Sequence, residues 1–412
     1  MDLRSPEGAA ALAAAARVVD GDPLAAAAAL RSAGIPADLA AAALTQAALR
    51  RRAVAKFGPD DAARMFFTRA GLEQATRAVV AARRAARLAA AGVRTMADLG
   101  CGLGADAIAC ARAGIRVHGV EADPATAAFA AANADACGVA DLFTVTPGRA
   151  EEADVSAVDA VFCDPARRAT GTGRRVFDPA AYSPPWDWVA ATVSRVPRAV
   201  LKVAPGFDFA RAPVGAEVEV VSADREVVEA ALWCGSLARV PRRATVLRRA
   251  TGLRGPAGPR DAAGPRDAAG PRDATAVELT GSGTAAGPVG PVRRFLYDPD
   301  GAVVRAHLVA EFAATLDGTL ADPDIAYVYA DEAVATPYAR CLEVVEVLPF
   351  SLKRLRALLR GRDVGAVEIM KRGSAVDVER LRRDLRLSGG GSASIVLTRV
   401  AGAPTALVCR PV

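Results

Sequence analysis

The chain has 412 residues, of which 52% are hydrophobic and 24% charged, and its formal net charge is +6 with a pI near 9.1. This length predicts two or three domains, and the apolar fraction is enough to build substantial cores. No apolar run approaches the ~20 residues that a transmembrane helix needs, and the first residues lack the basic start of a signal peptide. We therefore expect a cytoplasmic protein with no membrane contact.

Seven cysteines are scattered through the chain, and their odd number and irregular spacing argue against a disulfide framework. No two of them have the spacing of zinc ligands, and only two histidines could help, so we expect no metal site. Cys163 precedes an acidic residue, but its position at the end of an apolar run predicts a buried, unreactive thiol.

Residues 1–91 are rich in alanine and nearly free of β-branched runs, which predicts a helical N-terminal domain. The pattern indicates helices over 8–19, 23–33, 37–57 and 60–91. Pro36 and Pro59 are expected to break them. Because the last helix directly precedes the first strand, we expect it to lie on the ligand-binding side of the sheet with Phe66, Phe67, Leu72 and residues 74–76.

Residues 95–104, TMADLGCGLG, are the most informative stretch. An apolar run ends in Asp98, and Gly100, Gly102 and Gly104 follow before a helical pattern begins. A strand, a glycine turn and a helix N-terminus form the layout by which α/β sheets hold a nucleotide-like ligand. Glu121 closes the next apolar run, where a carboxylate suits the two hydroxyls of a ribose.

Two cofactors fit this pattern. A dinucleotide needs Gly-x-Gly-x-x-Gly/Ala, which Gly100, Gly102 and Ala105 satisfy loosely. Residues 98–104 also resemble the first motif of class I S-adenosylmethionine-dependent methyltransferases. In that family the acidic residue two before the first glycine lies near the methionine ammonium, whereas a dinucleotide site usually carries an apolar residue there. The resemblance implies S-adenosyl-L-methionine as the cofactor.

Further apolar runs at 142–146, 158–163 and 199–204 alternate with helical stretches, which predicts a Rossmann-like parallel sheet with helices on both faces. Ligands bind beyond the carboxyl ends of such strands, so acidic residues at the strand ends should converge on one rim. We expect a class I methyltransferase domain over 92–250. Its expected cofactor-binding residues are Asp98, Gly100, Gly102, Gly104, Glu121 and Asp164.

Asp164 and Pro165 resemble the Asp/Asn-Pro-Pro-aromatic motif of nucleic-acid amino-methyltransferases, in which the side-chain oxygen and the following backbone carbonyl hold an exocyclic amine. Here Ala166 replaces the second proline and Arg167 the aromatic residue. A guanidinium can also stack on a base or grip a phosphate. The resemblance implies catalytic roles for Asp164, Pro165 and Arg167. In the Arg- and Gly-rich loop that follows, the expected RNA contacts are Arg168, Arg174 and Arg175.

Residues 217–221 and 229–234 read as an antiparallel pair that closes the sheet, as is usual in class I methyltransferases. The next stretch, 251–291, contains three copies of Gly-Pro-Arg-Asp, beginning at residues 258, 264 and 270. Such repeats cannot form a core, so we expect a flexible linker. Glu278 and Leu279 are expected to begin the edge strand of the next domain.

Residues 292–412 predict a compact α+β module. Helices are indicated over 303–316, 351–359 and 378–385, and strands over 294–301, 326–329, 341–347, 364–370, 394–398 and 406–409. Between positions 340 and 412 there are 14 basic and 7 acidic residues, so this part carries more than the whole chain's excess of positive charge. Concentrated basic charge points to nucleic acid.

The phrases at 297–306, 347–355 and 369–373, together with the order of the three parts, resemble bacterial methyltransferases that carry a THUMP-like domain. THUMP domains belong to RNA-modifying enzymes and hold the RNA. The resemblance therefore implies an RNA methyltransferase acting on tRNA or rRNA. The basic residues expected to contact RNA from this module are Lys353, Arg354, Arg356, Lys371 and Arg372.

Three functions remain open from the sequence. The main hypothesis is an RNA base methyltransferase in which Asp164 positions the acceptor. The second is a small-molecule methyltransferase whose basic domain only mediates oligomerisation, and the C-terminal charge argues against it. The third is a non-catalytic RNA-binding protein that retains cofactor affinity. The intact glycines and Asp164 argue against that third function.

Overall fold

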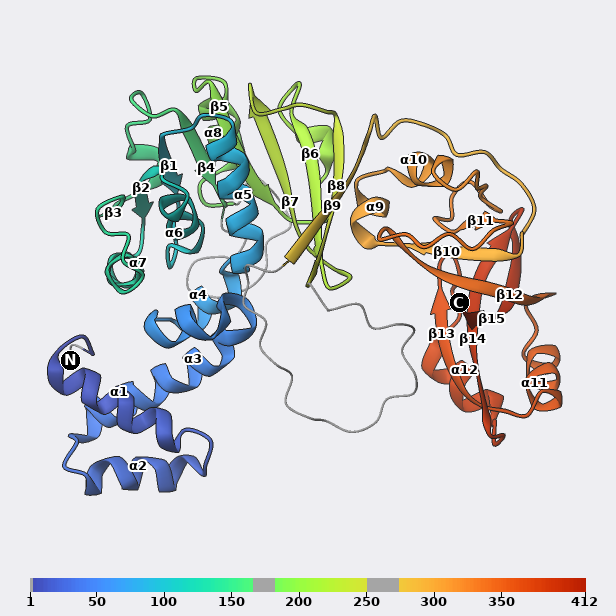
Figure 1. Ribbon diagram of the computed structural model, residues 1–412, viewed down its shortest axis with the longest axis horizontal. Coiled ribbons are helices and arrows are strands. Elements are labelled where there is room, and N and C mark those ends of the chain that lie inside the picture. The colour runs from blue at the N-terminus through green and yellow to red at the C-terminus, as the bar shows by residue number, and fades with distance from the viewer. Residues whose placement is uncertain (1–2, 166–181, 250–273) are drawn as a thin grey trace.

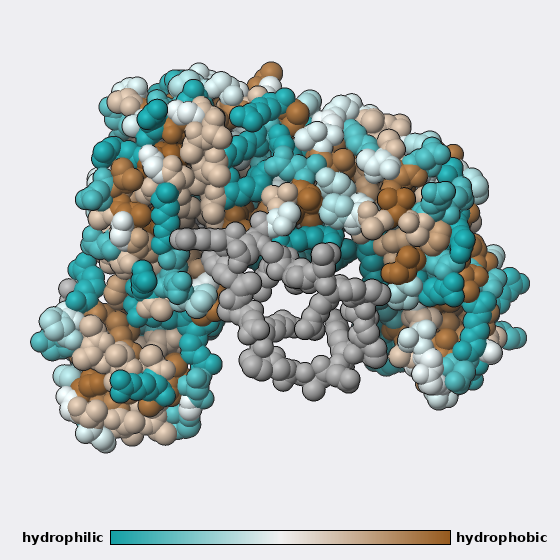
Figure 2. All heavy atoms as spheres, in the orientation of Figure 1, coloured by the Kyte–Doolittle hydropathy of each residue, from teal (hydrophilic) through white to brown (hydrophobic). Residues whose placement is uncertain are grey.

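The computed structural model describes residues 3–165, 182–249 and 274–412. Its core is a nine-stranded sheet, followed by a six-stranded sheet near the C-terminus. The N-terminal helices and the C-terminal module extend as two arms from opposite ends of the larger sheet (Figures 1 and 2). This order of helices, Rossmann-like sheet and α+β module confirms the expected fold class.

Helices form the whole N-terminal arm: α1 (Pro6–Val18), α2 (Pro23–Ser32), α3 (Ala37–Arg64), α4 (Arg69–Gln74) and α5 (Ala78–Ala90). Side-chain caps explain where the first two begin. Ser5 accepts a hydrogen bond from the backbone N–H of Gly8 at 3.1 Å, and Asp22 accepts one from Ala25 at 2.8 Å.

The single helix expected over 60–91 is wrong. α3 continues past Pro59, with a kink at Gly58 where φ is 78°. The chain is then extended at Phe66 and Phe67, because two buried amide side chains satisfy its backbone. Gln46 bonds both the N–H and the carbonyl of Phe67, and Asn133 does the same for Phe66.

The first half of the large sheet is parallel, in the order β3-β2-β1-β4-β5. Its strands are β1 (Thr95–Leu99), β2 (Arg116–Glu121), β3 (Phe143–Pro147), β4 (Ala160–Cys163) and β5 (Arg198–Val203). The helices between them are α6 (Ala105–Arg112), α7 (Pro124–Ala136) and α8 (Trp186–Val193). These elements match the expected alternation of strands and helices.

The second half of the sheet is mixed. It adds β7 (Glu226–Gly235), β6 (Glu217–Ala223), β8 (Arg242–Arg249) and β9 (Ala274–Gly281), in that spatial order. β6 and β7 form the expected antiparallel pair, whereas β8 was not expected. The strand expected from Glu278 is present as β9. β9 lies inside the stretch assigned to a linker and pairs with β8, so it is the edge strand of the first sheet rather than of the next domain.

The C-terminal module is a six-stranded sheet in the order β11-β10-β12-β15-β14-β13. Its strands are β10 (Phe295–Pro299), β11 (Val328–Ala330), β12 (Ala339–Pro349), β13 (Val364–Lys371), β14 (Gly391–Val400) and β15 (Ala403–Pro411). Its helices are α9 (Gly301–Arg305), α10 (Val309–Ala314), α11 (Leu352–Gly361) and α12 (Val378–Leu385). The one helix expected over 303–316 is divided at His307, whose φ of 61° is left-handed.

The two modules share one hydrophobic core. Val218 and Val220 of β6 belong to the same buried cluster as Val303 of α9 and Phe312 of α10. The intervening residues of β6, Glu217 and Glu219, are also buried but lie on the opposite face, since side chains alternate along a strand. β10, α9 and α10 therefore pack into the core of the large sheet, whereas α11, α12, β13 and β14 enclose separate hydrophobic clusters of the C-terminal module.

Among the described residues, no helix combines the length and the hydropathy needed to cross a membrane.

Candidate functional site

A cavity of about 580 Å³ lies at the carboxyl ends of the parallel strands. β2, β1 and β4 are neighbours in the sheet, so the acidic residues that end them reach the same rim. Asp98, Glu121 and Asp164 all line the cavity. The convergence expected from the strand order is therefore present, and it brings three carboxylates to one site.

The glycine turn forms the floor of this cavity. Gly100 has φ 92° and Gly102 has φ 55°, and both line the cavity. A side chain at Gly102 would meet no atom within 4 Å, which means that the turn faces open space. Gly104 does not line it: a Cβ there would lie 2.7 Å from the Phe143 ring, so this glycine is required for packing. The expectation that Gly104 contacts the cofactor thus lacks support in the geometry.

Asp98 is a buried acid without a partner. Its side chain is 1% exposed, and neither carboxylate oxygen has a hydrogen-bond partner among the described residues. Burial raises the pKa of Asp98 to about 7, and the negative charge of Asp164 adds to the shift. A buried carboxylate in this state is a ready partner for a cation, and the ammonium of the expected cofactor fits that requirement.

Glu121 braces the turn from the next strand. One carboxylate oxygen accepts a hydrogen bond from the N–H of Gly102 at 3.0 Å, and the other accepts one from Asp123 at 3.0 Å. Each oxygen can still accept a second hydrogen bond. The same side chain can therefore position the glycine turn and receive ribose hydroxyls.

Asp164 is joined to a chain of polar side chains that the sequence did not reveal. Lys202 of β5 lies 2.5 Å from one of its oxygens and donates a second hydrogen bond to Thr76 at 3.1 Å. Thr76 donates to Asp106 at 2.6 Å, and Asp106 pairs with the buried Arg84 of α5. The only sequence signal was a lone lysine in the apolar β5 run.

Only part of the expected catalytic motif can be placed. Pro165 is buried directly after Asp164. Burial raises the pKa of the Cys163 thiol, with Asp164 adding to the shift, so this cysteine stays protonated. Four expected contacts lie outside the described residues: Arg167, Arg168, Arg174 and Arg175.

The N-terminal arm supplies one wall of the cavity. Residues 74–76, at the end of α4 and just beyond it, line it as expected, whereas Phe66, Phe67 and Leu72 are buried and do not line it. Lys56 of α3 holds this wall by donating hydrogen bonds to the carbonyls of Leu72, Glu73 and Ala75 at 2.7 to 3.0 Å. Burial, together with the positive charge of Lys202, lowers the pKa of Lys56 to about 8. Lys56 therefore acts as a structural cap for α4.

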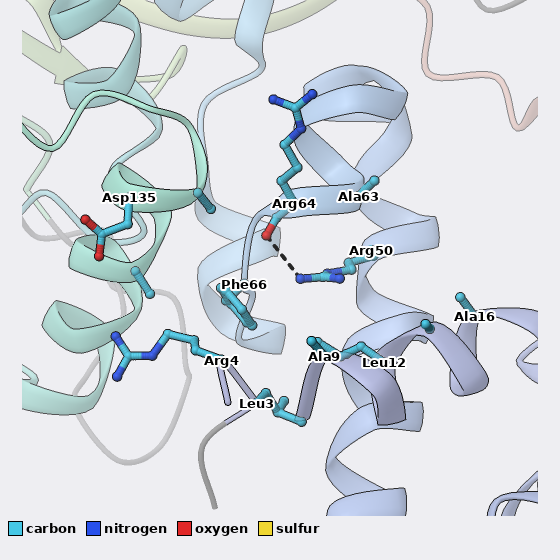
Figure 3. Close-up of a pocket in the computed structure, with 13 residues that line it drawn as sticks. Leu3, Arg4, Ala9, Leu12, Ala16, Arg50, Ala63, Arg64, Phe66 and Asp135 are labelled. Carbon is cyan, nitrogen blue, oxygen red and sulfur yellow. Dashed lines mark hydrogen bonds between the residues drawn. The ribbon is translucent and has the colours of Figure 1, made fainter. Parts of the chain in front are cut away.

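A larger hollow of about 880 Å³ lies between α1, α3 and α7 (Figure 3). Its lining is mainly alanine and leucine, and Arg50 is used to bond the carbonyls of Arg64 and Met65 at 3.0 Å. Asp135 is the one acid in the described lining. Without converging carboxylates or a glycine turn, this hollow lacks the features of a nucleotide-like site.

The basic residues expected to hold RNA divide into two groups. Lys353 and Arg354 are exposed on α11. Arg356 donates to the carbonyl of Asp384 in α12, and Arg372 pairs with Asp298 at 2.9 Å. Lys371 is exposed but donates to a neighbouring carbonyl at 2.9 Å. Arg356 and Arg372 thus have partners within the module, and contact of these five residues with RNA stays a prediction.

Comparison with known families and proteins agrees with this geometry. Residues 339–411 match a family described as THUMP domain-like, residues 65–178 match a precorrin methyltransferase domain, and residues 1–53 match a domain of unknown function. A crystal structure from Porphyromonas gingivalis W83, provisionally described as a methyltransferase, has a TM-score of 0.72 at 21% identity. It covers 98% of this chain and 97% of its own, which shows a shared fold.

Two sequences from Mycobacterium tuberculosis, strains CDC 1551 / Oshkosh and ATCC 25618 / H37Rv, are each 36% identical to this chain over 378 residues. Each match covers 88% of this chain and 95% of the relative, and both relatives are named uncharacterized S-adenosylmethionine-dependent methyltransferases. At this identity and coverage, the chain belongs to the family of S-adenosylmethionine-dependent methyltransferases.

Proposed function

We propose that this S-adenosylmethionine-dependent methyltransferase modifies a base in RNA, with tRNA or rRNA as the acceptor. The observation that carries the proposal is that Lys202 fixes one carboxylate oxygen of Asp164, so that the other can face an acceptor. Lys202 occupies one of its carboxylate oxygens at 2.5 Å, and the residue lines the cofactor cavity beside Pro165. The THUMP-like match over 339–411 supports RNA as the macromolecule that presents the base.

The cofactor would be held by the rim of the cavity. Asp98 receives its ammonium, Glu121 its ribose hydroxyls, and Gly100 and Gly102 allow its close approach to the backbone. The bound cofactor supplies a methyl group activated by a sulfonium centre. The residues of the chain then have to align the acceptor and exclude water.

Asp164 is proposed to position the acceptor amine. A carboxylate fixed on one side by Lys202 presents its other oxygen to an N–H group in a defined orientation. Together with the carbonyl of Pro165, it can receive both hydrogens of an exocyclic amine and so direct the nitrogen lone pair. Arg167 belongs to the proposal as a catalytic residue. Arg168, Arg174 and Arg175 belong to it as RNA contacts, as do the exposed Lys353 and Arg354.

A small-molecule acceptor is the second candidate, because residues 65–178 match a precorrin methyltransferase domain. That stretch includes the cofactor rim and Asp164 but ends before the C-terminal module. An amine or carbon acid on a small substrate could use the same carboxylate. This candidate assigns no role in substrate binding to the THUMP-like domain.

Incubation of the full chain with methyl-labelled S-adenosylmethionine and total cellular RNA, in parallel with a metabolite extract, separates the candidates. We expect label in RNA, and we expect Asp164→Ala to lower transfer at least about 100-fold while S-adenosylhomocysteine still binds. Asp154→Asn, an exposed acid before β4, is the control and should leave transfer unchanged. Label only in metabolites would favour the second candidate. Cofactor binding without transfer to either pool would leave a non-catalytic RNA-binding protein.

A further inference from the structure

A third cavity, a cleft of about 760 Å³, lies where the two modules meet. One wall is the segment 205–210 that follows β5, and the other is α9 with His307 beyond it. Three arginines line it: Arg242 from β8, Arg305 from α9 and Arg372 from the end of β13. The cleft is thus a meeting point of positive charge from three separate segments.

Arg242 is the unusual member of this group. Its Nη1 is buried and has no hydrogen-bond partner among the described residues. The guanidinium carbon lies 5.1 Å from the centre of the Phe209 ring, which holds it against the cleft wall. Burial lowers the pKa of Arg242, but its guanidinium remains charged at any ordinary pH. Arg242 is half-buried, and a guanidinium that has a buried nitrogen without a partner favours an anion beside it.

The other charges around the cleft leave it positive. Arg305 is exposed, and its Nη1 lies 3.3 Å from the carbonyl of Pro205. Arg372 is already paired with Asp298. The acid that lines the cleft, Asp208, uses one oxygen to accept the N–H of Ala210 at 3.0 Å. Arg242 and Arg305 are therefore available for a ligand, because no carboxylate within ion-pair distance neutralises either of them among the described residues.

The cleft also lies near the chemistry. Its wall begins at Pro205, three residues after Lys202, which holds Asp164. Within that wall, Phe207 packs on Trp186 at 4.7 Å between ring centres, and Pro184, just before that tryptophan, lines the cofactor cavity. A strand of nucleic acid that presents a base to Asp164 could therefore continue along the same edge of the sheet into this cleft.

We propose that this cleft between the modules binds a backbone phosphate of the RNA acceptor, with Arg242 and Arg305 as its ligands. Two guanidinium groups match the two non-bridging oxygens of a phosphodiester. The proposal rests on the proposed function, since it assigns the RNA a second point of contact beside the methylation site. The site is composite, because its lining comes from the large sheet on one side and from α9 on the other.

The test uses the full chain and fluorescein-labelled bulk tRNA, because phosphate contacts do not depend on sequence. Affinity is measured by anisotropy over a series of salt concentrations, and S-adenosylhomocysteine binding is measured by calorimetry. Arg305→Gln is the variant of choice because its side chain is exposed and its loss should not disturb folding. Arg242→Gln is the second variant, with its folding checked by thermal unfolding.

We expect each variant to weaken tRNA binding by about 10-fold and to reduce the slope of log affinity against log salt by about 1. S-adenosylhomocysteine binding should be unchanged. Arg116→Gln is the matched control: it removes the same charge from an exposed position where β2 begins, at the opposite edge of the sheet, and should have no effect.

If the wild type binds tRNA and both cleft variants match it in affinity and salt slope, the cleft proposal is wrong while the proposed function stands. If the wild type binds no tRNA and transfers no methyl group to RNA, both fail together. Binding of polyglutamate in preference to tRNA would also overturn the proposal, because it would identify the cleft as a site for an acidic polypeptide.

Discussion

Buried carboxylates occur in both halves of the large sheet, but in opposite states. On β6 and β7, Glu217, Glu219 and Glu229 are all buried and all paired with arginines of α5. On β1, Asp98 is just as buried and has no partner among the described residues. Figure 2 shows hydrophilic residues gathered along the junction of α5 with this side of the sheet.

This difference distinguishes acids that stabilise the fold from an acid that can bind a ligand. Burial alone would raise the pKa of Glu217, but hydrogen bonds from Arg87 and Arg243 outweigh it and hold that pKa below its usual value. The ionised Glu217 therefore stabilises the fold at a pH above its ordinary pKa, and this contribution is lost as the pH falls. For Asp98 the balance is reversed, because burial and the negative charge of Asp164 outweigh the lowering effect of Arg84 and Lys202 on its pKa. A paired acid attaches a helix to the sheet, whereas an unpaired acid leaves a place for a ligand.

Removing a partner from the paired half should have the largest effect. Arg84 is 3% exposed and pairs with both Asp106 and Glu229. Arg84→Met would leave two buried charges uncompensated, so we expect the free energy of unfolding to fall by about 3–5 kcal/mol. Chemical denaturation measures it. Arg382→Gln, which breaks an exposed pair on α12, is the control and should change it by about 0–1 kcal/mol. If both variants lower the free energy of unfolding equally, the buried pairs contribute no more to stability than the exposed pair.

Asp164 lies between the paired and the unpaired acids, because Lys202 pairs with only one of its carboxylate oxygens. Lys202→Met should lower methyl transfer by about 100-fold through loss of the orientation of Asp164. The dissociation constant of S-adenosylhomocysteine should change by less than about threefold. Lys202→Arg should recover part of the rate if the charge at this position matters. A loss of cofactor binding as large as the loss of rate would show that Lys202 acts on the fold rather than on the acceptor.

Replacing Glu121 should lower cofactor affinity less than replacing Asp98. It accepts two backbone hydrogen bonds, so Glu121→Gln keeps part of the support for the turn. We expect S-adenosylhomocysteine to bind more weakly by about 1–2 kcal/mol, because a charge-assisted ribose contact is lost. Calorimetry measures this, and Asp141→Asn, an exposed acid just before β3, is the control. Wild-type affinity in Glu121→Gln would exclude ribose contact through the charge of this side chain.

The sequence predicted the features that depend on local order along the chain. Because parallel strands end at one rim, the positions of Asp98, Glu121 and Asp164 could be inferred from the spacing of apolar runs. β8 could not, and the strand expected from Glu278 was assigned to the wrong sheet, because the glycine-proline repeat separates β8 from its partner β9 along the sequence.

Pairing between residues that are distant in the sequence could not be predicted either, because it does not depend on local order along the chain. The sequence carries no signal that the arginines of α5 meet Glu217 and Glu229, which lie more than a hundred residues later. The basic pattern predicts RNA contacts for Arg356 and Arg372, but it does not reveal their partners in α12 and β10. Charge on a helix or after a strand predicts solvent exposure only when no distant partner meets it.

The pH dependence of cofactor binding tests the central claim, that the unpaired Asp98 receives the cofactor ammonium. Because Asp98 has a pKa of about 7, it must lose a proton before it can hold a cation. In the cofactor-free protein the same ionisation lowers stability as the pH rises toward 7, since the folded protein holds that proton more tightly than the unfolded chain. Asp98→Asn should therefore bind cofactor poorly without being less stable at a pH of about 8.

The decisive measurement is the calorimetric affinity for S-adenosylhomocysteine between about pH 6 and about pH 8, for the wild type and for Asp98→Asn. The wild-type affinity should rise with pH up to about 7 and then level off. Asp98→Asn should bind more weakly by about 2–3 kcal/mol, with no such rise. If Asp98→Asn keeps wild-type affinity and the same dependence on pH, the assignment of the unpaired carboxylate to the cofactor is wrong.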